Sequence, residues 1–339
     1  MQYVVKRTVQ ALITLLFVVT ISFFLYRLLP GGPVEAMQQQ LVQEAMADGG
    51  QVNVQRINQM VAVRTGIRPD EPLYQQYLGY MESVVLHQDF GTSIWKNEPV
   101  FELLFTAMPW SVFISIYGLL LGFGVNVLLG AVMAYHEGGR FDRAMSVVAT
   151  ITSSVPYYVV AILLLAFLAF EAGLFPTGGR YNPATTPGFN LPFMASVVYH
   201  AILPIATGFV VGFGTQALAM RGNSVRVLGE EYIRVAQLRG LGEFRIATRY
   251  VTRNAILPLY TSLMVGISSI FSSSIIMEQL YSYPGVGWYT FGALEHRDYP
   301  LLMGVFLFFT IVTLLGVLVA DLTYGLIDPR ANTGDTESY

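Results

Sequence analysis

Side chains that could catalyse a reaction or bind a metal ion are few and scattered in this 339-residue chain. The chain has no cysteine, which excludes thiolate catalysis and cysteine-based metal sites. Its four histidines lack the i,i+4 pairing of a helical zinc site: His87, His136, His200 and His296. Neither a G-x-x-x-x-G-K-[ST] phosphate loop nor a G-x-S-x-G nucleophile elbow occurs. We therefore expect no catalytic residue, no metal and no enzymatic activity.

Three acidic residues, Glu171, Glu278 and Asp321, lie near the ends of long apolar runs. Ionisable groups in such positions are functional candidates in membrane proteins. A proton-coupled carrier would be expected to contain more of them than this chain does. For Asp321 we favour a structural ion pair with a partner arginine.

Five arginines lie between two long apolar runs: Arg234, Arg239, Arg245, Arg249 and Arg253. Apolar residues alternate with polar ones over Glu230–Arg239, which predicts a short helix. Gly240 would end this helix at a positive φ angle, and Glu243 would favour the start of a second helix. The pattern predicts a rigid knob of two short helices. Taken alone, it could equally be an amphipathic hairpin lying on anionic lipid.

The elements that carry these residues are expected to be membrane-spanning helices. The chain is 54% hydrophobic and 12% charged, whereas soluble domains average about 25% charged residues. A helix needs about 20 apolar residues to cross a bilayer. Six runs satisfy this length: Val9–Leu29, Phe105–Tyr135, Ala144–Phe170, Val197–Met220, Ala255–Leu280 and Leu301–Ile327. The sequence therefore predicts an all-α membrane protein with six transmembrane helices.

We interpret the first run as a retained helix, because its apolar stretch exceeds the usual 7–15 residues of a signal-peptide core. Basic residues then orient the chain, since cytoplasmic loops retain Lys and Arg. Placing both termini in the cytoplasm puts 12 of the 19 basic residues on the inner side. We expect a multi-pass protein of the cell membrane, with cytoplasmic N- and C-termini.

The segments between the runs suggest a division of the chain into four parts. Residues 1–29 contain the N-terminal tail and first span, and residues 30–104 form an extracytoplasmic insert. Residues 105–330 form a five-helix core with a cytoplasmic loop at 221–254, and residues 331–339 form a tail. In the insert, Gln51–Thr65 and Glu71–His87 have the apolar spacing of helices.

Two further patterns concern glycines and aromatic residues. Gly118-x-x-x-Gly122 and Gly208-x-x-x-Gly212 predict close packing of helix backbones. Residues 171–196 predict an irregular outer loop. The outer loop 281–299 predicts a tight turn at Pro284-Gly285-Val-Gly and an interfacial aromatic belt. That belt would comprise Tyr281, Tyr283, Trp288, Tyr289 and Tyr299.

Several motifs resemble the import permeases of ABC transporters, and specifically their dipeptide/oligopeptide/nickel branch. Tyr232-Ile-Arg-Val-Ala236-Gln-Leu-Arg-Gly240-Leu-Gly resembles the cytoplasmic coupling loop, although Arg234-Val235 replaces the usual Glu-Ala. Leu29-Pro30-Gly-Gly-Pro33, Asp89-Phe-Gly91-Thr-Ser93, Tyr283-Pro-Gly285-Val-Gly287 and Leu326-Ile-Asp328-Pro-Arg330 resemble further motifs of that family in the same order. The resemblance extends over nearly the whole chain.

The resemblance implies one permease subunit of an ATP-driven importer. Its partners would be the lipid bilayer, a second homologous permease subunit, two cytoplasmic ATPase subunits and an extracytoplasmic solute-binding protein, with no nucleic acid. ATP and Mg would be bound by the partner subunits, and this chain would carry no cofactor. A self-sufficient secondary transporter or channel is the alternative. The motifs do not decide between a dipeptide, an oligopeptide, a nickel chelate and a sugar oligomer as cargo.

The resemblance also suggests roles for particular residues. Those expected to contact an ATPase subunit are Tyr232, Arg234, Ala236, Arg239, Gly240, Leu241, Gly242 and Phe244. Those expected along the translocation path are Ser269, Ser272, Ser273, Met277 and Glu278, although the serines could instead bond their own helix carbonyls. Those expected to receive the binding protein are Tyr283, Pro284, Gly285 and Trp288.

Overall fold

The computed structural model describes residues 2–28, 33–47, 53–65, 71–87, 89–242, 245–256 and 275–327, together with Leu259, Leu263 and Gly266. Apart from one isolated β-bridge between Thr92 and Pro99, the regular structure in these ranges is helical. The chain divides into two compact units. Unit 1 comprises Met1–Pro109 and Gly285–Tyr339, and unit 2 comprises Trp110–Pro284.

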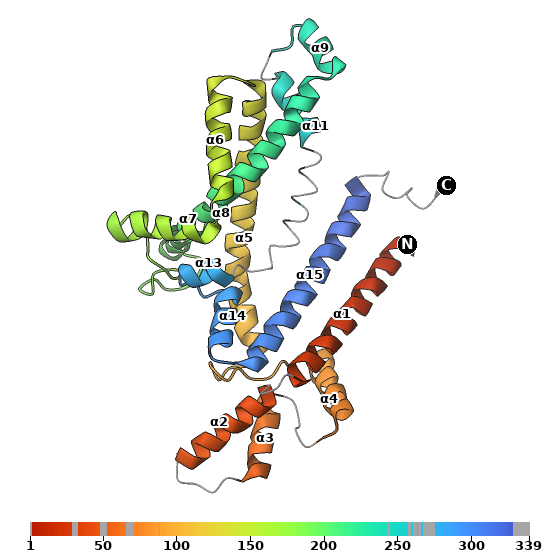
Figure 1. Ribbon diagram of the computed structural model, residues 1–339, viewed down its shortest axis with the longest axis vertical. Coiled ribbons are helices and arrows are strands. Elements are labelled where there is room, and N and C mark those ends of the chain that lie inside the picture. The colour runs from red at the N-terminus through yellow and green to blue at the C-terminus, as the bar shows by residue number, and fades with distance from the viewer. Residues whose placement is uncertain are drawn as a thin grey trace. The chain divides into compact units, whose positions relative to one another are not determined.

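Unit 1 is built around the first and last long helices. Its helices are α1 (Gln2–Leu28), α2 (Pro33–Ala47), α3 (Val54–Thr65), α4 (Leu73–Leu86), the start of α5 (Val100–Tyr135), α14 (Val286–Glu295) and α15 (Tyr299–Ile327). Helices α1 and α15 lie side by side although they come from opposite ends of the chain (Figure 1).

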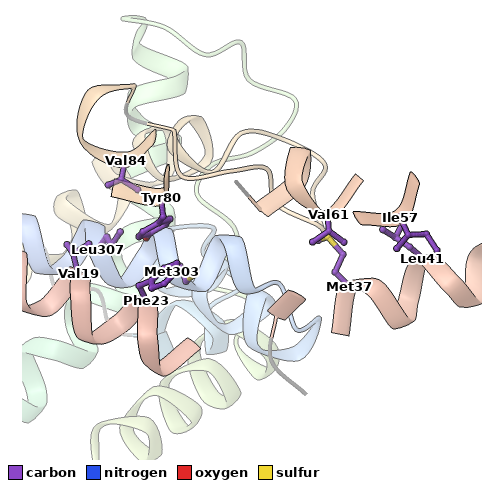
Figure 2. Packing of buried hydrophobic residues seen from close by; sticks show 10 residues of the cluster. All are labelled: Val19, Phe23, Met37, Leu41, Ile57, Val61, Tyr80, Val84, Met303 and Leu307. Atoms are coloured by element: carbon purple, nitrogen blue, oxygen red, sulfur yellow. The ribbon is translucent and has the colours of Figure 1, made fainter. Parts of the chain in front are cut away.

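The buried residues of unit 1 include one cluster that joins α1, α4 and α15. Val19 and Phe23 of α1 lie against Met303 and Leu307 of α15, with Tyr80 of α4 beside them (Figure 2). A second patch in the same figure joins α2 to α3 through side chains that are almost fully buried: Met37, Leu41, Ile57 and Val61. Burial of each such side chain stabilises the fold by about 1.5–3 kcal/mol.

The stretch Asp89–Ser93 forms a turn that is fastened to the start of α15. The Asp89 carboxylate accepts a hydrogen bond from the backbone N–H of Gly91 (2.8 Å), and Gly91 has a φ of 86°. The Ser93 hydroxyl then donates to the buried carboxylate of Asp298 (2.5 Å). Asp298 also accepts from the N–H of Leu301 (3.2 Å), where it caps the first turn of α15. The motif therefore fixes the path of the chain into α5.

Unit 2 contains the rest of α5 and the other helices. These are α6 (Arg140–Ser154), α7 (Tyr157–Leu164), the π-helix η1 (Leu165–Glu171), α8 (Leu191–Leu228), α9 (Glu231–Leu238), the π-helix η2 (Ile246–Val251), α11 (Thr252–Ala255) and α13 (Ile275–Leu280). Helices α5, α6 and α8 pack together (Figure 1). Gly130 and Gly214 permit this packing, because a Cβ at either position would collide with the backbone of a neighbouring helix.

Within the described ranges, four helices are long and apolar enough to cross a membrane: Val5–Phe24, Val100–Tyr135, Leu191–Leu228 and Tyr299–Leu318. They correspond to the first, second, fourth and sixth runs of the sequence. The number rises to five if a bent pair of helices is counted as one span. Most of the predicted fifth span, Ala255–Leu280, lies outside the described residues.

The predicted third span at Ala144–Phe170 is not one continuous helix. Helix α6 ends at Ser154, and the next helical segment runs from Tyr157 to Glu171 at an angle of 101° to it. Pro156 explains the break, because proline disfavours the helical conformation of the residue before it. Val155 is accordingly extended, with φ −91° and ψ 126°.

The two helices that apolar spacing predicted between the first two spans are confirmed as α3 and α4. Helix α2 was missed, because its Gln-rich sequence has a weak apolar pattern. Residues 171–196 form turns only as far as Asn190, whose side chain caps α8 by accepting from the N–H of Phe193 (3.0 Å). Helix α8 therefore begins earlier than the predicted fourth span.

Candidate functional site

A groove runs between α5 and α8 in unit 2. On α5 it is lined by Ser111, Ile114, Ser115, Gly118, Leu119, Gly122 and Asn126, and on α8 by Pro204, Ile205, Gly208, Gly212 and Gln216. The spacing follows the helical repeat, so each set occupies one face of its helix. The cavity measures about 290 Å³. Serines, glycines and amides therefore share the wall of this cavity with apolar side chains such as Ile114, Leu119 and Ile205.

The prediction that Gly118, Gly122, Gly208 and Gly212 pack against neighbouring backbones is wrong. Among the described residues, no atom lies within 4 Å of a Cβ placed at any of the four, apart from their own helix and chain neighbours. These glycines line the open groove instead. A small-x-x-x-small pattern marks a helix face without side-chain bulk, and such a face suits a cavity wall as well as a helix contact.

One end of the groove is formed by two amide side chains. The Nδ2 of Asn126 donates to the Oε1 of Gln216 (3.3 Å), which joins α5 to α8. Asn126 is 0% exposed, and its Oδ1 has no hydrogen-bond partner among the described residues. A buried amide oxygen without a partner is costly. It is therefore an acceptor available to a group that enters the groove.

The other end of the groove carries a carboxylate. Glu278 and Met277 of α13 line it, and Glu278 is 4% exposed. The Oε1 of Glu278 accepts a hydrogen bond from the hydroxyl of Ser111 on α5 (2.7 Å). Two of the residues predicted along a path, Met277 and Glu278, therefore lie on the cavity wall. The other three, Ser269, Ser272 and Ser273, lie outside the described residues.

The loop that follows α8 forms the predicted helical knob. Helix α9 covers Glu231–Leu238, and Ile233 and Ala236 on its inner face pack with Ile246 and Val251. Its outer face exposes residues of both apolar and basic character: Tyr232, Arg234, Val235, Leu238 and Arg239. The buried face fixes the position of the helix, and the exposed face is available for contact.

Gly240 has a φ of 70°, which confirms the left-handed conformation predicted for it. Its N–H donates to the carbonyl of Gln237 (2.9 Å), and the N–H of Leu241 donates to that of Ala236 (3.3 Å). This pair of hydrogen bonds is a Schellman motif, which ends a helix by satisfying its last carbonyl groups. Leu241 packs against the cluster beneath α9 and so completes the motif.

Ala236 is 3% exposed and packs inside the loop, so it offers little surface to a partner in this structure, and its expected contact role stays a prediction. Gly242 is exposed, Leu241 is partly buried, and Phe244 lies outside the described residues. The hydroxyl of Tyr232 accepts from the Nδ2 of Asn254 (3.1 Å), so this exposed ring is held against the second half of the loop.

The sequence matches two family descriptions that together cover almost all of it. Residues 126–333 match "Binding-protein-dependent transport system inner membrane component", and residues 1–116 match the N-terminal region of the same kind of component. The chain belongs to this family. It is therefore a transport component rather than an enzyme. The α9 loop and the α8 and α13 sides of the groove fall within the matched residues.

Curated relatives match this inner-membrane component over nearly its full length. The dipeptide transport system permease protein DppB of Bacillus subtilis is 29% identical over 97% of this chain and 97% of the relative. The oligopeptide transport system permease protein AppB of the same species is 28% identical over 97% and 98%. A solved inward-facing MetNI methionine ABC transporter is similar with a TM-score of 0.46, at 13% identity over 65% of this chain and 95% of that chain.

The aromatic residues 281–299 of this transport component do not form one surface belt. Tyr281 and Tyr283 are buried within unit 2, where Tyr283 packs near Trp110 and the Tyr281 hydroxyl hydrogen-bonds to that of Thr207 (2.7 Å). Tyr283 is 0% exposed and Gly285 is buried, so neither offers an open surface in this structure, and their expected role in receiving a partner stays a prediction. Pro284 and Trp288 are partly exposed.

An ion pair that sequence reasoning missed joins α6 to α8. Arg221 donates from Nε to Oδ1 of Asp142 (2.5 Å) and from Nη2 to Oδ2 (2.7 Å). Asp142 is 2% exposed and also accepts from the N–H of Gly138 (2.9 Å). Such bidentate pairs are strong and directional. The two residues are 79 positions apart in sequence, so no local pattern indicates that they meet.

Proposed function

We propose that this chain is one of two permease subunits of an ATP-driven importer of peptides or similar small solutes. The names of the relatives support this cargo class. In the proposed arrangement the chain crosses the cell membrane six times, both termini are cytoplasmic, and residues 30–104 form an extracytoplasmic insert. A solute-binding protein delivers the cargo, and two ATPase subunits bind ATP and Mg.

The α5–α8 groove is the observation that carries this proposal. Peptides present many backbone amides. Their transport requires polar groups that hydrogen-bond to these amides without selecting for particular peptide side chains. Ser111, Ser115, Asn126 and Gln216 supply such partners, while the four glycines keep the groove open. This lining forms half of the path, and the second permease subunit supplies the other half.

The α9 loop is proposed to transmit movement from the ATPase subunits. Its buried side is fastened by Ile233 and Ala236 and its corner is fixed by Gly240, so a force on the exposed face moves the loop as one body. Each nucleotide state of the ATPase must favour one conformation of the permease over another. Tyr232, Arg234 and Arg239 are the exposed residues proposed to dock.

The proposal is tested by reconstitution in lipid vesicles. The complete complex should accumulate peptide only when ATP, the ATPase subunits and the binding protein are all present. Concentrative peptide uptake by this chain alone would favour a self-sufficient secondary transporter or channel. If the complex took up other solutes in an ATP-dependent manner but no peptide, the chain would still be an importer subunit, and peptides would be rejected as its cargo.

A further inference from the structure

We infer that the groove recognises the positively charged amino terminus of its cargo at Glu278, and a backbone N–H of the cargo at Asn126. This inference rests on the proposed function, because it assigns a cargo chemistry to the same groove. Both residues present oxygen acceptors on the cavity wall. They lie on different helices, α13 and α5, and at different ends of the groove.

The carboxylate of Glu278 supplies the charge. Among the described residues that line the cavity, none is Lys, Arg or His, and Glu278 is the only formally charged one. A carboxylate in a recessed, weakly screened site attracts a cation far more strongly than one on an open surface. The Ser111 hydroxyl orients this carboxylate from α5, while the neighbouring Met277 keeps that part of the wall apolar.

The amide pair supplies a second, uncharged contact. Gln216 uses its Oε1 to accept from Asn126, which leaves the Asn126 Oδ1 as an acceptor with no partner in the described part of the chain. An N–H donor on the cargo would remove the cost of that buried oxygen. Peptide backbones carry one such donor at every residue other than proline. The combined preference is for a cargo with an ammonium group and repeated N–H donors.

The first test measures charge selectivity in the groove. The chain has no cysteine, so Ser115→Cys introduces one thiol on the groove wall. In the purified complete complex, we expect a cationic methanethiosulfonate to modify this thiol at least about tenfold faster than an anionic one, relative to an exposed Thr186→Cys control. Glu278→Gln should remove this preference, whereas Glu171→Gln, at an exposed site outside the groove, should preserve it. Equal rates for both reagents in the Ser115→Cys chain would overturn the inference.

The second test uses cargo without the binding protein, so that selection by that protein does not contribute. An alanine peptide of about seven residues, long enough to reach both acceptors, should slow modification of Ser115→Cys when its amino terminus is free, and its N-acetylated form should protect several-fold less. Glu278→Gln should abolish the difference between the two peptides, and Asn126→Leu should weaken protection by both equally. Equal protection by the two peptides in the chain with Glu278 would refute amino-terminal recognition. If the two peptides protected equally but the complete transporter still took up peptide, the proposed function would stand and only amino-terminal recognition would be rejected.

Discussion

Gly240 shows how one backbone angle can determine the shape of a docking element. Its φ of 70° allows the chain to close the Schellman motif and to turn from α9 towards η2. The residue type and its place after an amphipathic segment were sufficient to predict this conformation, because glycine alone adopts it without a steric cost. The glycines of the groove were misread for the opposite reason: absence of a side chain does not indicate what faces it.

Gly240→Val should weaken docking of the ATPase subunits about tenfold or more, since a strained non-glycine backbone costs on the order of 1–3 kcal/mol. Copurification of the ATPase subunits and cargo-stimulated ATP hydrolysis should fall together. Gly222→Ala is the control, because it lies on α8 outside the residues expected to contact the ATPase, without a positive φ and with no atom within 4 Å of the added Cβ in the described structure apart from its own helix. If the Gly240→Val variant docked as well as the wild type, the loop would be better interpreted as a hairpin that lies on the lipid surface than as a docking element.

Gly212 and Gly214 offer a comparison on one helix. A Cβ at position 214 would collide with the backbone oxygen of Ala149 on α6, whereas position 212 faces the groove. Gly214→Ala should therefore destabilise the protein by about 1–3 kcal/mol. Gly212→Ala should be neutral or stabilising by up to about 1 kcal/mol, because it favours the helix. Thermal unfolding in detergent measures both; the reverse order would contradict the assignment of these two faces.

At the scale of elements, α6 and α8 are joined by close backbone packing and by a buried ion pair. Packing through Gly214 and Ala149 could not be read from the sequence, because it depends on which helices become neighbours. The bend after α6 had a visible signal in Pro156. The apolar run continues through that proline, however, so hydropathy alone suggested a continuous span.

Arg221→Ala should destabilise the α6–α8 contact, because it leaves the Asp142 carboxylate buried without its cation. Removing one partner of a buried pair costs about 3–5 kcal/mol, and the expected loss is smaller here because the Arg221 side chain is 27% exposed. Thermal unfolding in detergent gives the magnitude. The double variant Asp142→Asn with Arg221→Ala should recover part of the loss. Equal stability of Arg221→Ala and the wild type would mean that water solvates the carboxylate.

At the scale of the whole chain, the sequence predicted the long helices of both units better than their junctions. Unit 1 gathers helices from both ends of the chain, which apolar periodicity cannot reveal. The chain passes between the units after Pro109 and after Pro284. Tyr283, next to the second passage, was expected at the surface because aromatic residues favour the membrane interface, but it is buried inside unit 2.

The proposed topology predicts that α4 and the α9 loop lie on opposite sides of the membrane. Gln75→Cys and Gly242→Cys place single thiols at two exposed positions in a chain without cysteine. In intact cells a membrane-impermeant maleimide should label Gln75→Cys alone, and permeabilised cells should show labelling of both. Labelling of Gly242→Cys in intact cells would reverse the orientation.

The separation of the two acceptor groups sets a length scale for the cargo. Ser111, which contacts Glu278, and Asn126 are 15 residues apart on α5, and this corresponds to about 22 Å along the helix axis. An extended peptide covers about 3.3–3.6 Å per residue, so about seven residues are needed to reach both ends. Shorter peptides must leave one acceptor before they reach the other. The groove would then pass them along in two steps, whereas a heptapeptide would be held at both ends at once and should leave more slowly.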